Sequence, residues 1–315
     1  MKTISVVIPT YHRYEALQDT VRDLLQQTVA PKQIIVVDNT TLSERKRPDY
    51  LVSNDKTECI YISSVKEGRI NAARNEGLRQ VTADYVILFD DDMSLPADCL
   101  ENFLKVHAEG WDSVTGTLVE EGEILESRNL GAARPIWRIL RTQHGTRPGT
   151  TIAVPSGFVS VRTEVIREIG YLDENFVYNY DDYDLGIRIW KSGYTSIRDP
   201  RVQGNHLKLP SGGSRTALTE SARRLNKYKS KYYFVLKHFN KRAVKIEFIT
   251  DILFIILDRK FTPLRAAREL FSVVRAFMQY SSSSEIGTTL RAASPAKSKI
   301  VDRKREIPTL SETNQ

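Results

Sequence analysis

The sequence predicts an α/β fold, with a mostly parallel sheet that carries helices on both faces and a helical extension at its C-terminal end. Two observations lead to this prediction. Strand-like and helix-like segments alternate four times between residues 4 and 107, and the strand-like segments are almost continuously apolar, as is typical of strands buried on both faces. After about residue 215 the chain becomes strongly basic, and apolar residues recur at helical spacing.

The expected sheet begins with β-branched runs. "ISVVIPT" predicts a strand over residues 4–10, and leucines and a valine at helical spacing predict a helix over 15–27. "QIIVVDN" predicts a second strand over 33–39, and the polar stretch 40–57 is expected to be a loop with a short helix.

Two further strand–helix pairs complete the alternation. Apolar runs predict strands over 59–63 and 85–89. The Ala- and Arg-rich segment 70–81 is expected to be a short helix, and another helix is expected between Pro96 and about residue 107.

The middle of the chain carries weaker signals. Residues 121–150 contain Gly, Pro and Arg with little periodicity, so we expect a mobile segment over the functional site. A strand followed by a helix is expected over 157–170, and another helix over 184–193.

Charge is distributed unevenly along the 315 residues. Residues 1–200 hold 23 Lys and Arg against 30 Asp and Glu, whereas residues 201–315 hold 23 against 9. A basic C-terminal third indicates attachment to an anionic surface, either nucleic acid or membrane. The two cysteines give no disulfide framework and no metal-ligand spacing, and Pro9 ends the N-terminal apolar run too early for a signal peptide. We therefore expect a cytoplasmic protein.

The C-terminal third divides into two parts by composition. We expect a domain large enough to be catalytic over 1–214, a basic, amphipathic helical region over 215–280 and a disordered tail over 281–315. The apolar stretch 248–257 is too short to span a bilayer. From Pro263 a basic amphipathic helix is expected. Its apolar stripe would consist of Leu264, Ala267, Leu270, Phe271, Val274, Phe277 and Met278.

Polar residues follow the ends of three predicted strands. Thr10, Tyr11 and Arg13 follow the first strand, Asp38 ends the second, and Asp90–Asp92 follow the fourth. Ligands of such sheets bind beyond the carboxyl ends of the strands. Three adjacent carboxylates repel one another, and a chain tolerates them on a solvated loop or where a cation or a metal–polyphosphate compensates their charge.

Five motifs now occur in a characteristic order: "VVIPTYHR", "VVDN", "GRINAARNEGL", "LFDDD" and "GYLDENF…DDYDLGIRIWKSGY", followed by a histidine. This order resembles the inverting family 2 glycosyltransferases, which have the GT-A fold, a Rossmann-like sheet with helices on both faces. The resemblance covers residues 3–210. It implies an enzyme that moves a sugar from a nucleotide-diphosphate donor to a hydroxyl of a glycan or lipid-linked acceptor, as in polysaccharide or glycoconjugate biosynthesis.

The resemblance also implies a divalent cation, Mn²⁺ or Mg²⁺. Asp90 and Asp92 correspond to the family's DxD pair, with Asp92 favoured as the direct ligand, and whether Asp91 substitutes for either is open. His206 resembles the family's late histidine, which approaches the metal or the diphosphate. Such a cation neutralises the diphosphate leaving group.

A nucleotide site is implied in the same way. Asp38 resembles the residue that accepts a hydrogen bond from the base, and Thr10 and Tyr11 resemble those that contact the base. Either Arg69 or Arg74 would close over the nucleotide, although Arg74 can equally be read as a salt-bridged helix residue. The full nucleotide-binding set is Pro9, Thr10, Tyr11, Arg13, Asp38, Arg69, Arg74, Asp90 and Asp91.

Inversion needs a base on the face of the sugar opposite the leaving group. The family's catalytic aspartate corresponds to Asp182, but Asp181 stands where the family usually has glutamate, so either residue remains a candidate for the base. No covalent intermediate is required. Asp184 is expected to cap the N-terminus of the following helix, and Arg188 to pair with an upstream acid.

Three other functions agree with parts of the sequence. A sugar nucleotidyltransferase would need a Gly-rich first loop, which "IPTYHR" lacks. A nucleic-acid-binding protein could use Lys227, Tyr228, Lys229, Lys231, Tyr232 and Tyr233. That function leaves both carboxylate clusters unexplained, so no nucleic acid is expected. A pseudoenzyme is disfavoured because all the expected acids are present.

The basic, amphipathic C-terminal helices suggest a hypothesis about localisation. They would attach the enzyme peripherally to an anionic membrane, at the inner face of the plasma membrane. The alternative is that these helices pack on the catalytic domain or pair two copies as a dimer.

Overall fold

The computed structural model describes residues 2–66, 68–120, 123–124, 154, 156–209, 211–213, 216–257 and 262–282. Its elements are β1 Ile4–Thr10, α1 Tyr14–Leu25, β2 Gln33–Asp38, η1 Leu42–Glu44, β3 Glu58–Ser63, α2 Ile70–Leu78, β4 Tyr85–Phe89, β5 Met93–Ser94, α3 Cys99–Ala108, β6 Ser113–Glu120, β7 Glu123–Ile124, β8 Phe158–Arg162, α5 Thr163–Glu168, α6 Asp181–Lys191, β9 Ser196–His206, α7 Glu220–His238, α8 Lys241–Leu257 and α9 Pro263–Ser282. The expected segment 121–150, apart from β7, and the expected tail beyond residue 282 lie outside the described residues.

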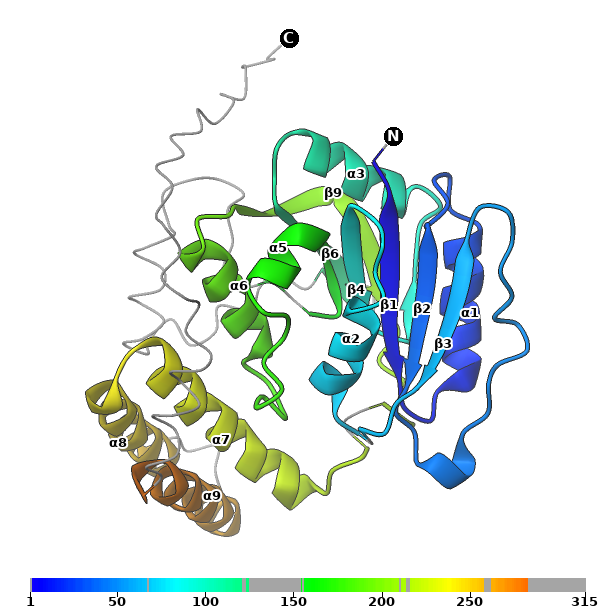
Figure 1. Cartoon of the computed structure of the whole chain (residues 1–315). Coiled ribbons are helices and arrows are strands. Elements are labelled where there is room, and N and C mark those ends of the chain that lie inside the picture. The colour runs from blue at the N-terminus through cyan, green and yellow to red at the C-terminus, as the bar shows by residue number, and fades with distance from the viewer. Residues whose placement is uncertain are drawn as a thin grey trace.

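The described strands form one nine-stranded sheet in the order β3-β2-β1-β4-β8-β6-β9-β5, with β7 paired to β6 (Figure 1). The pairs among β3, β2, β1 and β4 are all parallel, which confirms the α/β prediction. The second half is mixed, because β8 runs antiparallel to both β4 and β6. In the parallel half Thr10 is aligned with Asp38, so the carboxyl ends of β1 and β2 meet at one edge.

Helices cover both faces of the sheet. One apolar layer lies between the sheet and helices α1 and α3, and a second lies between the opposite face of the sheet and helices α2, α5 and α6 (Figure 1). Gly77 lets α2 approach closely, since a Cβ there would lie 2.6 Å from a methyl of Val7 and 2.9 Å from one of Val37. This close packing brings the N-terminal turn of α2 to the same edge of the sheet as the strand ends.

Helices α7, α8 and α9 pack on one another at the lower left of Figure 1. Their shared core contains Tyr232, Phe234 and Val273, and it also includes Phe176 and Ile187 from the sheet-bearing part of the chain. These contacts attach the helices to the rest of the protein, and the boundary near residue 214 stays a prediction.

This packing buries several residues that a nucleic-acid-binding protein would use. Tyr232 and Tyr233 are buried, and the Lys231 ammonium is buried between Glu247, at 2.5 Å, and Asp251, at 2.8 Å. A buried ion pair and buried rings are not available to phosphates and bases.

No residue of the predicted apolar stripe of α9 is fully buried. The helix buries Val273 and Ala276, which are not part of that stripe, and only Leu270 and Phe277 of the stripe are half-buried beside them. The rest of the stripe is exposed, at Leu264, Ala267, Phe271, Val274 and Met278. Exposed apolar residues also occur on α8, at Ile246, Ile249, Leu253, Phe254, Ile256 and Leu257. Among the described helices, none has the length and hydropathy that crossing a bilayer requires.

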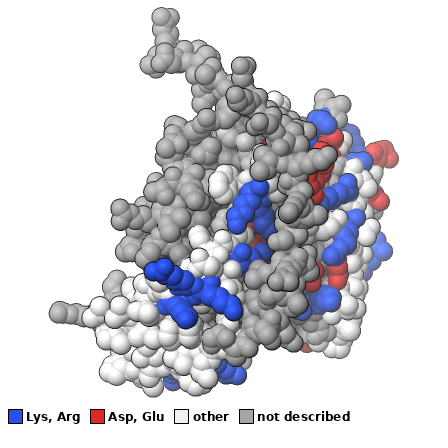
Figure 2. Space-filling model, turned by 60° about the vertical axis from the view of Figure 1, so that its left-hand side comes forward, with Lys and Arg blue, Asp and Glu red and all other residues white. Residues whose placement is uncertain are grey.

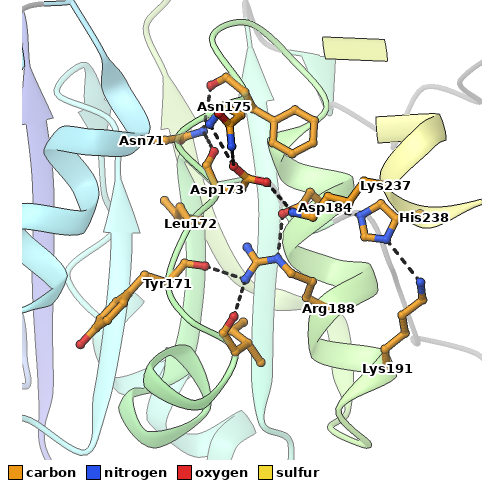
Figure 3. Close-up of polar contacts among 12 residues, drawn as sticks. Asn71, Tyr171, Leu172, Asp173, Asn175, Asp184, Arg188, Lys191, Lys237 and His238 are labelled. Atoms are coloured by element: carbon orange, nitrogen blue, oxygen red, sulfur yellow. Dashed lines mark hydrogen bonds and ion pairs between the residues drawn. The ribbon is translucent and has the colours of Figure 1, made fainter. Parts of the chain in front are cut away.

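A polar junction of Asp173, Asp184, Arg188, Lys237 and His238 joins α6 to α7 (Figure 3). The Asp184 carboxylate accepts a hydrogen bond from Arg188 Nε at 2.8 Å, and it lies 2.6 Å from Lys237 Nζ and 2.8 Å from His238 Nε2. Lys237 also pairs with Asp173 at 2.5 Å.

The predicted capping role of Asp184 is therefore wrong. Helix α6 begins at Asp181 with Tyr180 at the N-cap position, so Asp184 lies one turn inside the helix and its carboxylate is used at the junction. The acid paired with Arg188 is Asp184 itself, four residues upstream.

Candidate active site

One cavity of about 790 Å³ opens beyond the carboxyl ends of β1 and β4. Nearly all of the predicted site residues line it, from five different parts of the chain. These residues are Pro9, Thr10, Tyr11, Arg13, Arg74, Asp90, Asp91, Asp92, Asp182 and His206. The fold thus brings both predicted carboxylate clusters to the same cavity.

Asp90, Asp92 and His206 form a cluster suited to a cation. Each offers one ligand atom, and these atoms all lie within 4.8 Å of one another. The pairing of β5 with β9 aligns His206 with Met93, which brings the imidazole next to Asp92. The nearest approach is 3.2 Å, between His206 Nε2 and Asp92 Oδ1.

Two further observations show that these residues fit a divalent ion. Asp92 Oδ1 is buried, and apart from the contact with His206 Nε2 at 3.2 Å no hydrogen bond to it is found among the described residues, so the oxygen and the imidazole nitrogen face the same ligand position. Gly157 supplies the space for the Asp90 carboxylate, because a Cβ at this position would lie 2.2 Å from Asp90 Oδ2. Carboxylate oxygens and imidazole are common donors to Mn²⁺, and Mg²⁺ favours carboxylates.

Arg13 holds the triplet from the other side. Its Nη1 lies 2.7 Å from Asp92 Oδ2 and 3.2 Å from Asp91 Oδ1, while Nε and Nη2 donate to the backbone carbonyls of Ser211 and Leu209. The guanidinium therefore links the end of β1 to the segment after β9 and compensates part of the triplet's negative charge.

Asp91 and Asp92, the two buried acids of the triplet, differ in pKa. Burial raises the pKa of Asp91 to about 7, although Arg13 and the Thr10 hydroxyl oppose this. Burial also acts to raise the pKa of Asp92, but the neighbouring His206 and Arg13 outweigh it and leave that pKa below its usual value. Asp92 is thus the acid that the protein keeps ionised.

Arg74 connects the two carboxylate clusters. This buried guanidinium donates to Asp90 Oδ1 and to Ser156 Oγ, both at 2.8 Å, and lies 3.7 Å from Asp181 Oδ2. Ser156 Oγ in turn donates to Asp181 at 3.0 Å. Arg74 is therefore both salt-bridged and at the cavity, so the two readings of this residue are compatible.

Asp182 lines the cavity at the start of α6. The backbone N–H of Ser156 donates to its Oδ1 at 2.7 Å. Burial first, and the adjacent Asp181 second, raise the pKa of Asp182 to about 7. The preceding residues Asn179 and Tyr180 both adopt left-handed backbone conformations, at φ 62° and 71°. Such costly geometry is often found where a side chain must be aimed into a site.

Two predicted site residues do not reach the cavity. Asp38 is fully buried, and its carboxylate accepts from Tyr14 Oη at 2.6 Å, Tyr61 Oη at 2.8 Å and the backbone N–H of Thr40 at 2.9 Å. Arg69 donates to the Glu174 carbonyl at 3.0 Å, away from the cavity lining. Their nucleotide-binding roles stay predictions.

Other lining residues were not foreseen from the sequence. Asn39 lines the cavity next to Asp38, and its buried Oδ1 has no hydrogen-bond partner among the described residues. Ser156 and Gly157 stand just before β8, and the antiparallel pairing of β8 with β4 places them beside Asp90. The "SGF" turn before an apolar strand was the only sequence signal for this pair. Lys208, also in the lining, lies two residues after His206.

A cation-ready acidic cluster and a second acid in one cavity, at the carboxyl edge of an α/β sheet, define a candidate group-transfer enzyme. Residues 5–170 match the sequence profile of glycosyl transferase family 2, which is more than half of the chain. The chain belongs to this family and is a glycosyltransferase.

Individual relatives agree with this assignment. The chain is 30% identical over 189 residues to the uncharacterized glycosyltransferase YwdF of Bacillus subtilis, covering 60% of this chain and 68% of the relative. It is 26% identical over 222 residues to the amylovoran biosynthesis glycosyltransferase AmsB of Erwinia amylovora, covering 67% and 72%. A third relative is the GalNAc(5)-diNAcBac-PP-undecaprenol beta-1,3-glucosyltransferase of Campylobacter jejuni, at 27% identity over 125 residues, covering 39% and 40%.

Solved structures agree on the fold. The mannosyltransferase PcManGT from Pyrobaculum calidifontis, in complex with GDP-Man and Mn²⁺, superposes with a TM-score of 0.53 at 16% identity, covering 93% of this chain and 86% of that one. GalNAc-T7 with UDP, GalNAc and Mn²⁺ gives a TM-score of 0.56 at 13% identity, covering 93% and 58%. The GT-A fold prediction is confirmed.

Proposed function

We propose that this glycosyltransferase is metal-dependent and inverting, and that it transfers a sugar from a nucleotide-diphosphate donor to a hydroxyl group. One observation carries the proposal. The cluster of Asp90, Asp92 and His206 and the acid Asp182 line the same cavity, so a leaving group and an attacking hydroxyl have separate, chemically suitable partners. The structures that share the fold were obtained with GDP-Man or UDP and with Mn²⁺, which supports this donor class.

The donor side is built to hold negative charge on a cation. Asp90, Asp92 and His206 would hold Mn²⁺ or Mg²⁺, which when bound supplies positive charge to the departing diphosphate. Arg13 and Arg74 hold the surrounding carboxylates in place by ion pairs, so the ligand atoms are oriented before the donor binds.

Asp182 is the proposed base. A base must accept the proton of the acceptor hydroxyl as that oxygen attacks the anomeric carbon from the face opposite the diphosphate. A pKa near 7 suits this task, because the acid is ionised in part of the molecules and binds the proton well. Asp181 is instead engaged by Ser156 Oγ and lies near Arg74, which favours Asp182 over Asp181.

The donor half of the proposal can be tested by thermal unfolding with Mn²⁺ and UDP, GDP, dTDP or CDP in turn. A ligand at a hundredfold excess over its Kd stabilises the folded state by about 2.7 kcal/mol. We expect one nucleotide to raise the midpoint, with Mn²⁺ required and with the effect lost in Asp92→Asn. Asp199→Asn is a matched control, since Asp199 pairs with Arg201 outside the cavity. No shift with any nucleotide would refute the donor site.

Stereochemistry tests the other half. With the matching nucleotide sugar and an accepted glycan or lipid-linked acceptor, NMR of the product should show inversion at the anomeric carbon. A retained configuration would exclude Asp182 as the base of a single displacement.

We further propose that α8 and α9 attach the enzyme to an anionic membrane. Their exposed apolar residues lie on the same helices as exposed basic ones, including Lys245 and Arg275, which is the pattern of an interfacial helix. Flotation with phosphatidylglycerol vesicles should be lost in Ile249→Glu/Leu253→Glu and kept in Leu42→Glu/Val52→Glu, which changes two exposed apolar residues outside α8 and α9. Unchanged flotation of the double variant would refute the proposal. A wild-type protein that forms a dimer stable at high salt and does not float with the vesicles would also refute it.

A further inference from the structure

A second hollow, of about 440 Å³, adjoins the candidate active site. It lies between α7 and α9 and shares Tyr178, Arg223 and Lys227 with the larger cavity. The described residues that line it are Tyr178, Glu220, Arg223, Arg224, Lys227, Thr262, Leu264, Arg265, Arg268 and Glu269. The shared residues place the two spaces next to each other, within reach of one extended ligand.

The hollow is strongly positive. Five Lys and Arg side chains line it against two Glu. Both carboxylates lie against the same guanidinium, because Arg224 pairs with Glu220 at 2.5 Å and with Glu269 at 3.2 Å. Tyr228 Oη also donates to Glu269 at 2.7 Å. Both acids thus lie against one side chain, and among the described lining residues Lys and Arg outnumber Glu by three.

The N-terminus of α9 adds to this field. The helix is 20 residues long and begins at Pro263, directly after Thr262 of the lining. The positive end of its dipole therefore lies at the hollow and favours an anion there. The contribution is that of the dipole, because Pro263 has no N–H and those of Arg265 and Ala266 donate to Thr262. Guanidinium groups supply the paired donors that phosphate oxygens accept.

An apolar surface leads away from the hollow. Leu264 belongs to the lining and is 63% exposed, and Phe271 and Met278 are exposed further along α9. Figure 2 shows Lys and Arg side chains clustered above a broad, mostly uncharged surface in the lower part of the molecule, with a few basic side chains at its lower edge, where Figure 1 places the C-terminal helices. A ligand with an anionic head and an apolar tail would match both features.

We propose that this hollow binds the phosphate or diphosphate group of a lipid-linked acceptor. The proposal rests on the proposed function, because it places the acceptor's hydroxyl at Asp182 and its phosphate among Arg223, Arg265 and Arg268. The lipid chain then runs over α9 toward the membrane. Because the two spaces adjoin at Tyr178, Arg223 and Lys227, one acceptor can reach from the base to the basic hollow.

Farnesyl diphosphate is a soluble probe that carries both parts of such an acceptor. Its binding to the full chain can be measured by calorimetry in EDTA, so that no cation-dependent binding at Asp90 and Asp92 contributes. We expect Arg265→Glu/Arg268→Glu to weaken binding about tenfold or more. Arg275→Glu is the matched control, since this exposed arginine lies on the same helix outside the hollow. Equal unfolding midpoints will establish that all variants fold.

Three further arms identify the source of the phosphate. Farnesol, which lacks the diphosphate, should bind at least about tenfold more weakly than farnesyl diphosphate if the anion is recognised. Inorganic diphosphate should compete with the probe. Phosphatidylglycerol vesicles should not displace it, whereas displacement would assign the hollow to membrane headgroups and overturn the acceptor proposal.

The result that overturns the proposal outright is equal binding of the probe to the wild type and to the double variant. This test needs no donor, cation or turnover, so its failure is separate from that of the proposed function. Conversely, a chain that binds the probe in the hollow but responds to no nucleotide would retain the phosphate site and lose the transferase mechanism.

Discussion

The two carboxylate clusters of the candidate site look alike in sequence but are held differently. Asp90–Asp92 follow a strand, and Asp181, Asp182 and Asp184 begin a helix. Each cluster contains one acid whose pKa is raised to about 7 by burial, Asp91 in the first and Asp182 in the second. Each also contains an acid whose pKa is lowered by cationic or imidazole neighbours that outweigh the effect of burial, Asp92 and Asp184.

The difference lies in what the ionised acid faces. Asp92 lines the cavity, and its buried Oδ1 contacts the imidazole of His206, a second candidate ligand, at 3.2 Å. Asp184 is not among the cavity-lining residues, and Arg188, Lys237 and His238 surround its carboxylate. An acid that shares a ligand position with an imidazole therefore belongs to the chemistry, whereas an acid surrounded by three basic partners belongs to the architecture.

The largest expected effect is that of Asp92→Asn. Replacing a charged ligand by a neutral amide should weaken the cation and reduce sugar transfer by about a thousandfold, in line with the loss of a major electrostatic contribution. Turnover of the matching nucleotide sugar measures this. A variant that keeps more than a tenth of wild-type turnover would place the cation elsewhere.

Asp182→Asn should reduce transfer by about a hundredfold or more, because general-base catalysis contributes at this level. In the wild type, activity should rise with pH through about 7, where Asp182 becomes ionised. This acid limb should be absent from the residual activity of the variant. An unchanged limb would assign it to another group.

The same variant makes a prediction about stability. A carboxyl whose pKa is raised by folding binds its proton more tightly in the native state, so its ionisation destabilises the protein as pH rises toward about 7. Asn cannot ionise and still accepts from the Ser156 N–H. Relative to the wild type, Asp182→Asn should therefore be more stable at pH 8 than at pH 5 in urea unfolding. A difference that stays constant with pH would contradict the raised pKa.

Asp184→Asn should act on stability first. Removing one partner of a buried ion network costs about 3 kcal/mol at neutral pH. Because folding lowers the pKa of Asp184, its contribution is present above the unfolded pKa and is lost as pH falls through the folded one. Urea unfolding should show the deficit at pH 7 and a smaller deficit in strong acid. Equal stability at pH 7 would show that the junction contributes nothing.

Gly157→Ala should have the smallest effect. The added methyl would displace the Asp90 carboxylate, which a Cβ would approach to 2.2 Å, so cation affinity should fall about tenfold while Asp92 stays in place. Gly110→Ala would not serve as the control, because Gly110 has a positive φ of 103°. The control is Ala108→Gly at the end of α3, which also changes one side-chain carbon and should leave the cation affinity unaltered. An unaltered cation affinity in Gly157→Ala would mean that Asp90 is not a ligand.

The parallel half of the sheet could be predicted because its strands are uninterrupted apolar runs. Strand β6 was not foreseen, since "SVTGTLVE" mixes polar and small residues, although it lies between β8 and β9 in the sheet. The predicted start of α6, at residue 184, lies inside the helix, because the left-handed residues Asn179 and Tyr180 precede Asp181 and no side chain caps the helix. Local propensity does not reveal such conformations.

The site divides in the same way. The cavity acids could be predicted from motifs that follow strands, because strand ends converge in this class of sheet. The position of Asp38 could not, since hydroxyls of Tyr14 and Tyr61, from α1 and β3, enclose its carboxylate. The basic hollow could not be predicted either, because it depends on how α7 and α9 pack. The arginines that these two helices contribute to it are about 40 positions apart in the chain.

The central claim is that Asp90, Asp92 and His206 hold a divalent cation for the donor diphosphate. Electron paramagnetic resonance of Mn²⁺ titrated into the protein, with and without the nucleotide that shifts its unfolding midpoint, tests it most directly. We predict a single bound ion whose affinity increases with the nucleotide and falls about a hundredfold in Asp92→Asn, with Asp199→Asn unchanged. Wild-type affinity in Asp92→Asn, or no bound Mn²⁺ with any of the four nucleotides, would contradict the account.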